Sequence, residues 1–157
     1  MDFNEMLNAK GVDFEGIDMR HFLLGMLSAF DNRYQACADS LIGEITWKQF
    51  FAIICLNLCN ENPTINELSE IMGSSHQNVK QILLKLEKKG FVTMVQDEKD
   101  KRKQRICLTK ACKEFCDKKD EDSTMFITQL FHEISEEQIM STIKTIILMQ
   151  KNLEKFH

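Results

Sequence analysis

Residues 64–109 carry the pattern that most constrains how this chain can fold. Two amphipathic segments lie on either side of Gly73, and two β-prone runs, 91–95 and 105–108, come next. Glycine readily takes the left-handed conformation that ends a helix, so the first half predicts two helices joined by a tight turn. The β-prone runs enclose the charged residues 96–104 and predict a hairpin with a charged tip. The stretch therefore predicts a helix-turn-helix followed by a β wing.

Helix-starting signals place most of the other elements. At four places that precede an apolar helical pattern, the sequence has Ser or Thr followed three residues later by Gln or Glu. In this pattern the first side chain caps the free amides of a helix and the second reaches back to the cap. The pairs predict helices opened by Thr46, Thr64, Ser74 and Ser135. Apolar side chains that recur every three or four residues over 17–41 predict a long helix before them.

Two more helices are predicted after the wing. Thr109 opens the first, and residues 139–156 keep an apolar stripe to the end of the sequence. An exposed apolar stripe of that length needs cover, which a second copy of the chain would supply. The chain is thus predicted to be one compact domain, mostly α with a small β-hairpin wing. Its parts are an N-terminal arm and first dimerisation helix (1–42), a winged helix-turn-helix lobe (43–109) and C-terminal dimerisation helices (110–157).

The charge distribution favours a local DNA-binding surface. The net charge is −4, but residues 61–108 hold 9 basic and 7 acidic side chains, and the segments on both sides are net negative. A local basic surface can bind DNA, because phosphate contacts are short-ranged and screened by salt. Asn and Gln can bond adenine in two places, and Ser and helix N-terminal amides suit phosphates. The candidate DNA-binding residues are Thr64, Ser74, Ser75, His76, Gln77, Asn78, Lys80, Gln81, Lys85, Lys99, Asp100, Lys101, Arg102 and Lys103.

The order and spacing of residues 86–109 resemble the MarR family of bacterial transcription regulators. The matching pieces are Leu-Glu-Lys-Lys-Gly-Phe-Val at 86–92, Asp97, the pair Asp100-x-Arg102, and Ile-x-Leu-Thr at 106–109. The resemblance places Arg102 at the tip of the wing, where Asp100 is expected to orient a neighbouring basic side chain. It also places residues 74–81 at the start of the recognition helix.

The resemblance implies a function as well as a fold. It implies a winged helix-turn-helix homodimer whose N- and C-terminal helices intertwine, and which binds double-stranded DNA at a pseudo-palindromic operator. Repression of transcription is the expected outcome. A small hydrophobic or aromatic effector, bound in a pocket beside the DNA-binding lobe, would release the protein from the DNA. The candidate ligand-binding residues, each of which also suits a plain core, are Phe22, Met26, Trp47, Phe50, Phe51 and Ile54.

Two other interpretations of the same fold stay open. Six cysteines include the pairs 55/59 and 112/116, whose spacing suits a thiol or metal sensor as well as a buried helix face. A winged helix can also be a protein-interaction module that never touches DNA. In that case the basic residues form only a solvated face and a charged loop.

An enzyme or a membrane protein is not expected. No nucleophile–base pairing, phosphate loop or metal-ligand motif stands out, so the sequence assigns no catalytic residue, cofactor or metal. No apolar run reaches the roughly 18 residues that a membrane span needs. The acidic N-terminus lacks the pattern of a secretory signal. The expected location is the cytoplasm, where cysteines stay reduced.

Overall fold

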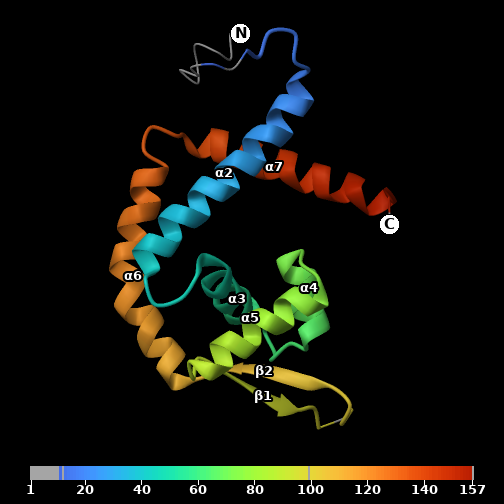
Figure 1. Ribbon diagram of the computed structural model, residues 1–157, viewed down its shortest axis with the longest axis vertical. Coiled ribbons are helices and arrows are strands. Elements are labelled where there is room, and N and C mark those ends of the chain that lie inside the picture. Colours follow the sequence, from blue (N-terminus) through green and yellow to red (C-terminus); the bar gives the residue numbers. More distant parts are fainter. Residues whose placement is uncertain (1–10, 12, 99, 157) are drawn as a thin grey trace. The chain divides into compact units, whose positions relative to one another are not determined.

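The computed structural model describes residue 11 and residues 13–98 and 100–156. In this part of the chain the elements follow in the order α2 (Met19–Ile42), α3 (Trp47–Leu58), α4 (Ile65–Met72), α5 (His76–Lys88), β1 (Val92–Gln96), β2 (Gln104–Leu108), α6 (Lys110–Leu130), α7 (Glu136–Leu153) and the 3-10 helix η1 (Glu154–Phe156) (Figure 1). The predicted mostly α fold with a small hairpin wing is confirmed. The chain divides into two compact units, Met1–Glu114 and Phe115–His157.

Helix α3 lies at the centre of the first unit. It begins with the predicted capping box, in which the Thr46 hydroxyl accepts from the Gln49 amide and the Gln49 side chain accepts from the Thr46 amide. Ala52 and Ile53 are fully buried, and α3 packs against α2, α4, α5 and β2. Before it, Gly43 ends α2 with a positive φ of 73°. The apolar α3 is therefore the core around which the winged helix-turn-helix is built.

Helices α4 and α5 form the predicted helix-turn-helix. Thr64 opens α4 with the second predicted capping box, and Gly73 ends it in the left-handed conformation at φ 59°. The third predicted capping box is wrong by one residue, because Ser75 and not Ser74 caps α5. After Gly73 the backbone stays extended through Ser75 (ψ 146°), so Ser75 is the residue whose hydroxyl accepts from the Asn78 amide, at 3.3 Å.

The inner faces of α4 and α5 fill the core beside α3. Leu68 on α4 and Leu83 and Leu86 on α5 are fully buried. Ile71, three residues after Leu68 on α4, is 50% exposed. The buried side of the short α4 is centred between Leu68 and Ser69, and residue 71 lies well off that direction at 100° per residue. Figure 1 shows the two helices joined by the short turn.

The wing is an antiparallel hairpin that runs straight into α6. Strands β1 and β2 pair from Val92↔Leu108 to Gln96↔Gln104, each starting or ending one residue away from the predicted runs. Thr109 closes the hairpin: its hydroxyl donates to the Gly90 carbonyl at 2.6 Å and accepts from the Cys112 amide at 3.1 Å. This threonine therefore both fastens the base of the wing and caps α6, as predicted.

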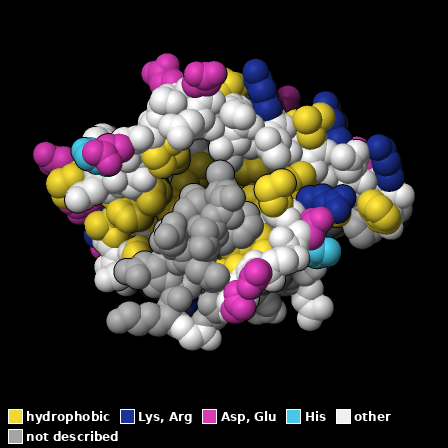
Figure 2. All heavy atoms as spheres, turned by 90° about the horizontal axis from the view of Figure 1, so that it is seen from above, with side chains coloured by type: hydrophobic (Ala, Val, Ile, Leu, Met, Phe, Trp, Pro, Cys, Tyr) yellow, Lys and Arg dark blue, Asp and Glu magenta, His cyan; other side chains and the backbone are white. Residues whose placement is uncertain are grey.

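The second unit carries long helices with exposed apolar side chains. Ser135 opens α7 with the fourth predicted capping box. No described residue of α7 is buried, and its large apolar side chains Met140, Ile143, Ile146, Ile147, Leu148 and Leu153 are all exposed. Hydrophobic side chains gather on the face seen in Figure 2. Among the described residues no single helix is long and apolar enough to cross a membrane, and one bent pair, α2 with α3, passes by length and composition only.

Candidate nucleic-acid interface

The first turns of α5 present an exposed polar surface. Its residues are Ser74, Ser75, His76, Gln77, Asn78, Lys80, Gln81 and Lys85, and together they are called the recognition surface below. All of them except the half-buried Ser74 are exposed. The opposite side of the helix is held in the core by Val79, Leu83 and Leu86, which are fully buried. The apolar side of α5 thus fixes the direction in which the recognition surface points.

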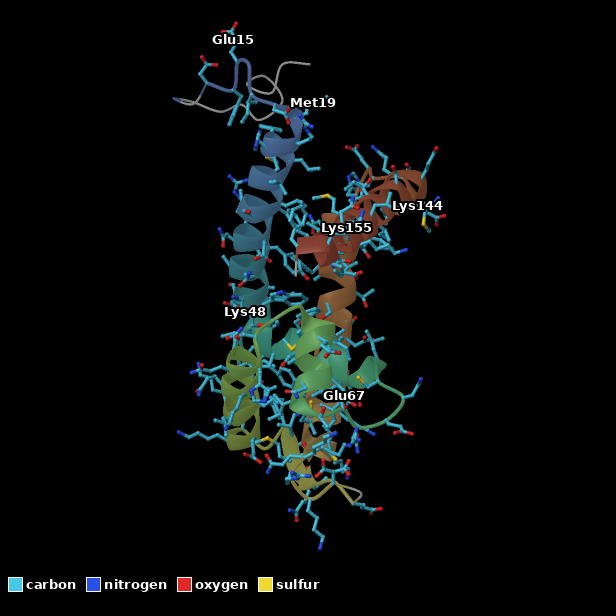
Figure 3. All side chains as sticks on the ribbon, turned by 90° about the vertical axis from the view of Figure 1, so that its right-hand side faces the viewer. Glu15, Met19, Lys48, Glu67, Lys144 and Lys155 are labelled. Atoms are coloured by element: carbon cyan, nitrogen blue, oxygen red, sulfur yellow. The ribbon has the colours of Figure 1, made fainter. Side chains whose placement is uncertain are left out.

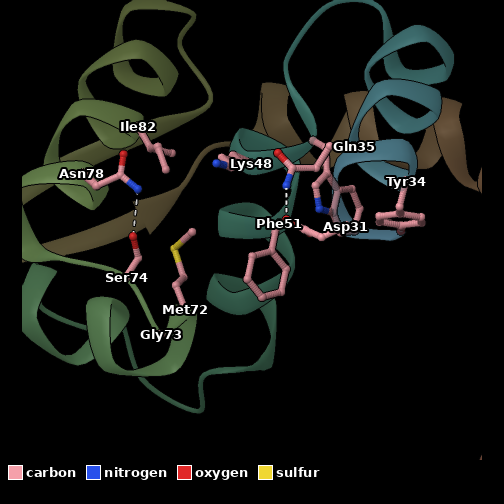
Figure 4. A pocket seen from close by; sticks show the side chains of 11 residues that line it. Asp31, Tyr34, Gln35, Lys48, Phe51, Met72, Gly73, Ser74, Asn78 and Ile82 are labelled. Atoms are coloured by element: carbon pink, nitrogen blue, oxygen red, sulfur yellow. Dashed lines mark hydrogen bonds between the residues drawn. The ribbon is translucent and has the colours of Figure 1, made fainter. Parts of the chain in front are cut away.

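Local hydrogen bonds order the start of this surface. The Asn78 side-chain amide donates to the Ser74 hydroxyl at 2.8 Å (Figure 4). The Ser75 hydroxyl caps the helix, and the remaining amides of the first turn are those that an anion such as a phosphate would accept from. A positioned amide side chain and a helix N-terminus are features that suit contacts with base edges and with phosphates.

Ser75→Ala is expected to lower the free energy of unfolding by about 1 kcal/mol, because it removes the side-chain cap of α5. Urea unfolding monitored by circular dichroism measures the change. Ser74→Ala is the matched control, since Ser74 precedes the cap and its hydroxyl accepts from the Asn78 side chain. An equal loss in both variants would contradict the assignment of Ser75 as the cap.

The tip of the wing gathers basic side chains around one carboxylate. The carboxylate of Asp100 accepts from the Arg102 amide at 3.1 Å and lies 3.6 Å from Arg102 Nε and 3.9 Å from Lys103 Nζ. Lys101, Arg102 and Lys103 are exposed. Asp100 thus pairs with the neighbouring basic side chains, as the sequence predicts. Lys99, the other basic residue predicted here, lies outside the described residues.

Thr64 is placed differently from the other candidate DNA-binding residues. It is only 9% exposed, and its hydroxyl accepts from the Glu67 amide at 3.3 Å, which is the capping bond of α4. The Glu67 carboxylate in turn accepts from the Thr64 amide at 2.7 Å. Hydrogen bonds from Thr64, backbone first and side chain second, lower the pKa of Glu67, and the charge of Arg105 adds to the effect. In the structure, Thr64 therefore caps the N-terminus of α4.

Arg105 was not among the candidate residues that the sequence patterns singled out. Its guanidinium donates to the side chains of Asp97 and Glu67, and these contacts raise its pKa, the hydrogen bond to Asp97 most of all. Its partners lie 8 and 38 residues away in the chain. Periodicity and capping signals are local, so neither could have revealed the cluster.

A cavity of about 460 Å³ lies between α2, α3 and the turn of the helix-turn-helix (Figure 4). Tyr34, Trp47 and Phe51 form an aromatic side, in which the rings of Tyr34 and Trp47 meet edge to face at 4.7 Å and those of Trp47 and Phe51 stack at 5.9 Å. Burial raises the pKa of the Tyr34 hydroxyl. The other lining residues are Asp31, Gln35, Lys48, Met72, Gly73, Ser74, Asn78 and Ile82.

Only some of the candidate ligand-binding residues line this cavity. Trp47 and Phe51 line the cavity. Phe22, Met26, Phe50 and Ile54 do not line it, although all four are half-buried. Several of the lining residues that the sequence did not suggest are polar, and two of these, Ser74 and Asn78, belong to the recognition surface as well. A molecule in the cavity would therefore touch the same side chains that begin α5.

The six cysteines, all within the part of the chain that the structure describes, form no disulfide. Cys55 and Cys112 are buried, Cys37 is exposed, and Cys59, Cys107 and Cys116 are half-buried. Burial raises the pKa of Cys55, which disfavours the reactive thiolate. Within residues 13–98 and 100–156, no three His, Cys, Asp or Glu side chains come together as metal ligands.

The comparisons with known proteins agree with the resemblance read from the sequence. The model of the MarR family matches residues 45–103, which span α3 to the tip of the wing, so the resemblance to that family is confirmed over this stretch. No curated protein matches the chain.

Solved structures of MarR-type regulators share the fold at low sequence identity. A MarR/EmrR family transcriptional regulator from Acinetobacter sp. ADP1 is 17% identical, with a TM-score of 0.78 over 88% of this chain and 99% of its own. The organohalide-sensing regulator RdhR in its 2,4-dichlorophenol bound form is 18% identical, with a TM-score of 0.78 over 91% and 86%. Staphylococcus aureus MepR in complex with DNA is 20% identical, with a TM-score of 0.71 over 85% and 95%.

Proposed function

We propose that this MarR-type winged-helix protein is a sequence-specific DNA-binding transcriptional regulator that acts as a homodimer in the cytoplasm. The recognition surface enters the major groove and reads base edges, and the wing tip reaches the adjacent minor groove. Repression by blocking a promoter is the outcome we propose. The observation that carries the proposal is the joint exposure of the recognition surface and of Arg102 on a lobe that matches the MarR family.

The recognition surface and the wing tip are suited to different contacts with DNA. Gln77, Gln81 and Asn78 carry side-chain amides that can make paired hydrogen bonds to adenine in the major groove. Arg102 carries a guanidinium at the end of a hairpin, which suits a narrow minor groove with its concentrated negative potential. Lys80 and Lys85 provide charge for phosphates, which contributes affinity without sequence information.

The exposed apolar side chains of α7 support the proposed homodimer. A single chain leaves Met140, Ile143 and Ile147 between 44% and 51% exposed. A second copy with the same stripe would cover them, and two copies would present two recognition surfaces. Such a pair binds half-sites about 34 Å, or one helical turn of DNA, apart. The operator is then an inverted repeat.

Arg102→Ala is expected to weaken binding to the operator about 10-fold and to lower the slope of log affinity against log salt by about 1, because it removes one contact in the minor groove. Fluorescence anisotropy at several salt concentrations measures both. Lys113→Ala on α6 is the control for loss of an exposed positive charge elsewhere. Unchanged affinity together with an unchanged slope would rule out the wing contact.

A small aromatic effector with an acidic group is the second part of the proposal. It is supported by the cavity, which has Tyr34, Trp47 and Phe51 on one side and Lys48 on its wall. The ligand-bound RdhR structure shows that a regulator of this fold can hold a chlorophenol. A ligand that contacts Ser74 and Asn78 would bind the DNA-free protein more tightly and so oppose DNA binding.

The effector is tested by a thermal-shift screen of substituted benzoic acids and phenols. A binder is expected to raise the melting temperature of the wild type and to raise it far less in Trp47→Ala and Lys48→Ala. Phe22→Ala, which changes an aromatic residue outside the cavity, is the control. If every compound that binds shifts all of these variants equally, the cavity is not the effector site.

A further inference from the structure

Arg105 on β2 joins the helix-turn-helix to the wing through three hydrogen bonds. Its Nε donates to Asp97 Oδ2 at 2.5 Å, and its Nη1 donates to Glu67 Oε2 at 3.1 Å and to the Asn62 carbonyl at 3.1 Å. The three acceptors belong to Asp97 directly after β1, to α4 and to the segment before α4. In Figure 3 the labelled Glu67 lies on α4 near the hairpin. One side chain therefore touches three separate parts of the DNA-binding lobe.

On the helix side, Arg105 shares an acceptor with the cap of α4. Glu67 Oε2 accepts from the Thr64 amide at 2.7 Å and from Arg105 as well. The backbone of β2 follows the same segment, since the Ile106 amide donates to the Pro63 carbonyl at 2.9 Å and Thr64 forms a β-bridge with Arg105. The first turn of the helix-turn-helix and the second strand of the wing are thereby held together.

On the wing side, the contacts continue to the tip. Asp97 is only 8% exposed, and while its Oδ2 accepts from Arg105, its Oδ1 accepts from the Asp100 amide at 2.8 Å. The Asp100 carboxylate accepts from the Arg102 amide. A continuous series of hydrogen bonds thus runs from Glu67 on α4 through Arg105 and Asp97 to the backbone of Arg102.

We propose that Arg105 is a positioning residue for DNA binding, which sets the wing tip and its Arg102 at a fixed place relative to the recognition helix. It acts through Glu67 and Asp97 and does not itself contact DNA. The inference rests on the function proposed above. A planar guanidinium with several fixed donors can hold two carboxylates and a carbonyl at once, which a lysine ammonium on its flexible stem does not reproduce.

The physical gain lies in ordering the wing before DNA arrives. A hairpin tip that is free to move loses conformational entropy when a groove fixes it, and that cost weakens binding. The network removes part of that cost in advance. Without Arg105 the nearly buried Asp97 carboxylate would lose a charged partner, and the tip would be expected to rearrange so that the carboxylate meets water.

A double-mutant cycle tests the proposal. Wild type, Arg102→Ala, Arg105→Gln and the double variant are titrated against one selected operator duplex by fluorescence anisotropy. Arg102→Ala is expected to weaken binding about 10-fold in the wild type. In the Arg105→Gln background it is expected to weaken binding by only about 2-fold, because a mobile tip no longer places Arg102, and contacts that depend on each other are non-additive. Arg105→Lys is expected to behave like Arg105→Gln.

Additive losses, with Arg102→Ala costing the same factor in both backgrounds, would overturn the positioning role. So would a wild-type affinity in Arg105→Gln, or full recovery in Arg105→Lys, which would show that charge alone suffices. A wild type that binds no duplex would instead overturn the proposed function. Lys110→Gln is the control, since it breaks an ion pair of 3.6 Å with Glu114 outside the network and should change affinity by less than about 2-fold.

Glu67→Gln keeps the test decisive if Arg105→Gln does not fold. The glutamine can still accept from the Thr64 amide and close the capping box, but it removes the negative charge that faces Arg105. The same loss of coupling with Arg102→Ala is expected, to a smaller extent. Unchanged coupling in a folded Glu67→Gln would contradict a path through α4.

Discussion

Ile143→Glu is expected to split the dimer and to weaken operator binding by at least about 100-fold, because two linked half-sites gain that much or more over one. Ile143 is 45% exposed in the single chain, on an α7 stripe that includes Ile146 and Ile147. If a second copy covers this stripe, a carboxylate placed in the contact would lose its water without a partner, which costs several kcal/mol. Sedimentation equilibrium and anisotropy titration measure the two effects.

The matched control for this variant is Ser141→Glu. It adds the same charge to the same helix, and Ser141 lies about 160° around the helix from Ile143 at 100° per residue. Ser141→Glu is expected to remain a dimer with unchanged affinity. A dimeric Ile143→Glu that binds the operator normally would show that α7 is not the contact between copies.

Leu83→Ala is expected to lower the free energy of unfolding by about 2–5 kcal/mol, since it leaves a cavity behind the recognition helix. Leu83 is fully buried on α5. The next residue offers a sharp comparison, because Leu84 carries the same side chain on the same helix but is 41% exposed. Leu84→Ala should cost about 1 kcal/mol or less. Similar losses in denaturant unfolding would contradict the inward direction of Leu83, and with it the outward direction of the recognition surface.

Most helix starts could be predicted from the sequence, because the capping signals are local. Thr46, Thr64 and Ser135 cap their helices as predicted, because a capping box involves only four consecutive residues. The pattern does not distinguish Ser74 from Ser75, because serine is a common capping residue and the two are adjacent. The choice between them depends on where the chain leaves the turn at Gly73, which the pattern does not state.

Features that depend on distant residues could not be predicted in this way. In the sequence, Arg105 is only one of several basic residues in the predicted hairpin. Its contact with Glu67 depends on the packing of α4 beside β2, which local patterns do not predict. The cavity, too, is lined by residues that are distant from one another in the sequence. Its aromatic side was anticipated at Trp47 and Phe51, which lie on an apolar helix face. Its polar wall at Ser74 and Asn78 comes from the helix-turn-helix, 27 residues after Trp47 in the case of Ser74.

A selection of bound sequences from random duplex DNA tests the central claim most directly. The wild-type chain is expected to enrich one inverted repeat whose half-site centres lie about 10 base pairs apart, one helical turn. Gln81→Ala should relax the preference at one position in each half-site and leave the spacing unchanged. Recovery of random sequence after repeated rounds at physiological salt would contradict a sequence-specific regulator. Recovery of a single unrepeated half-site would contradict the homodimer.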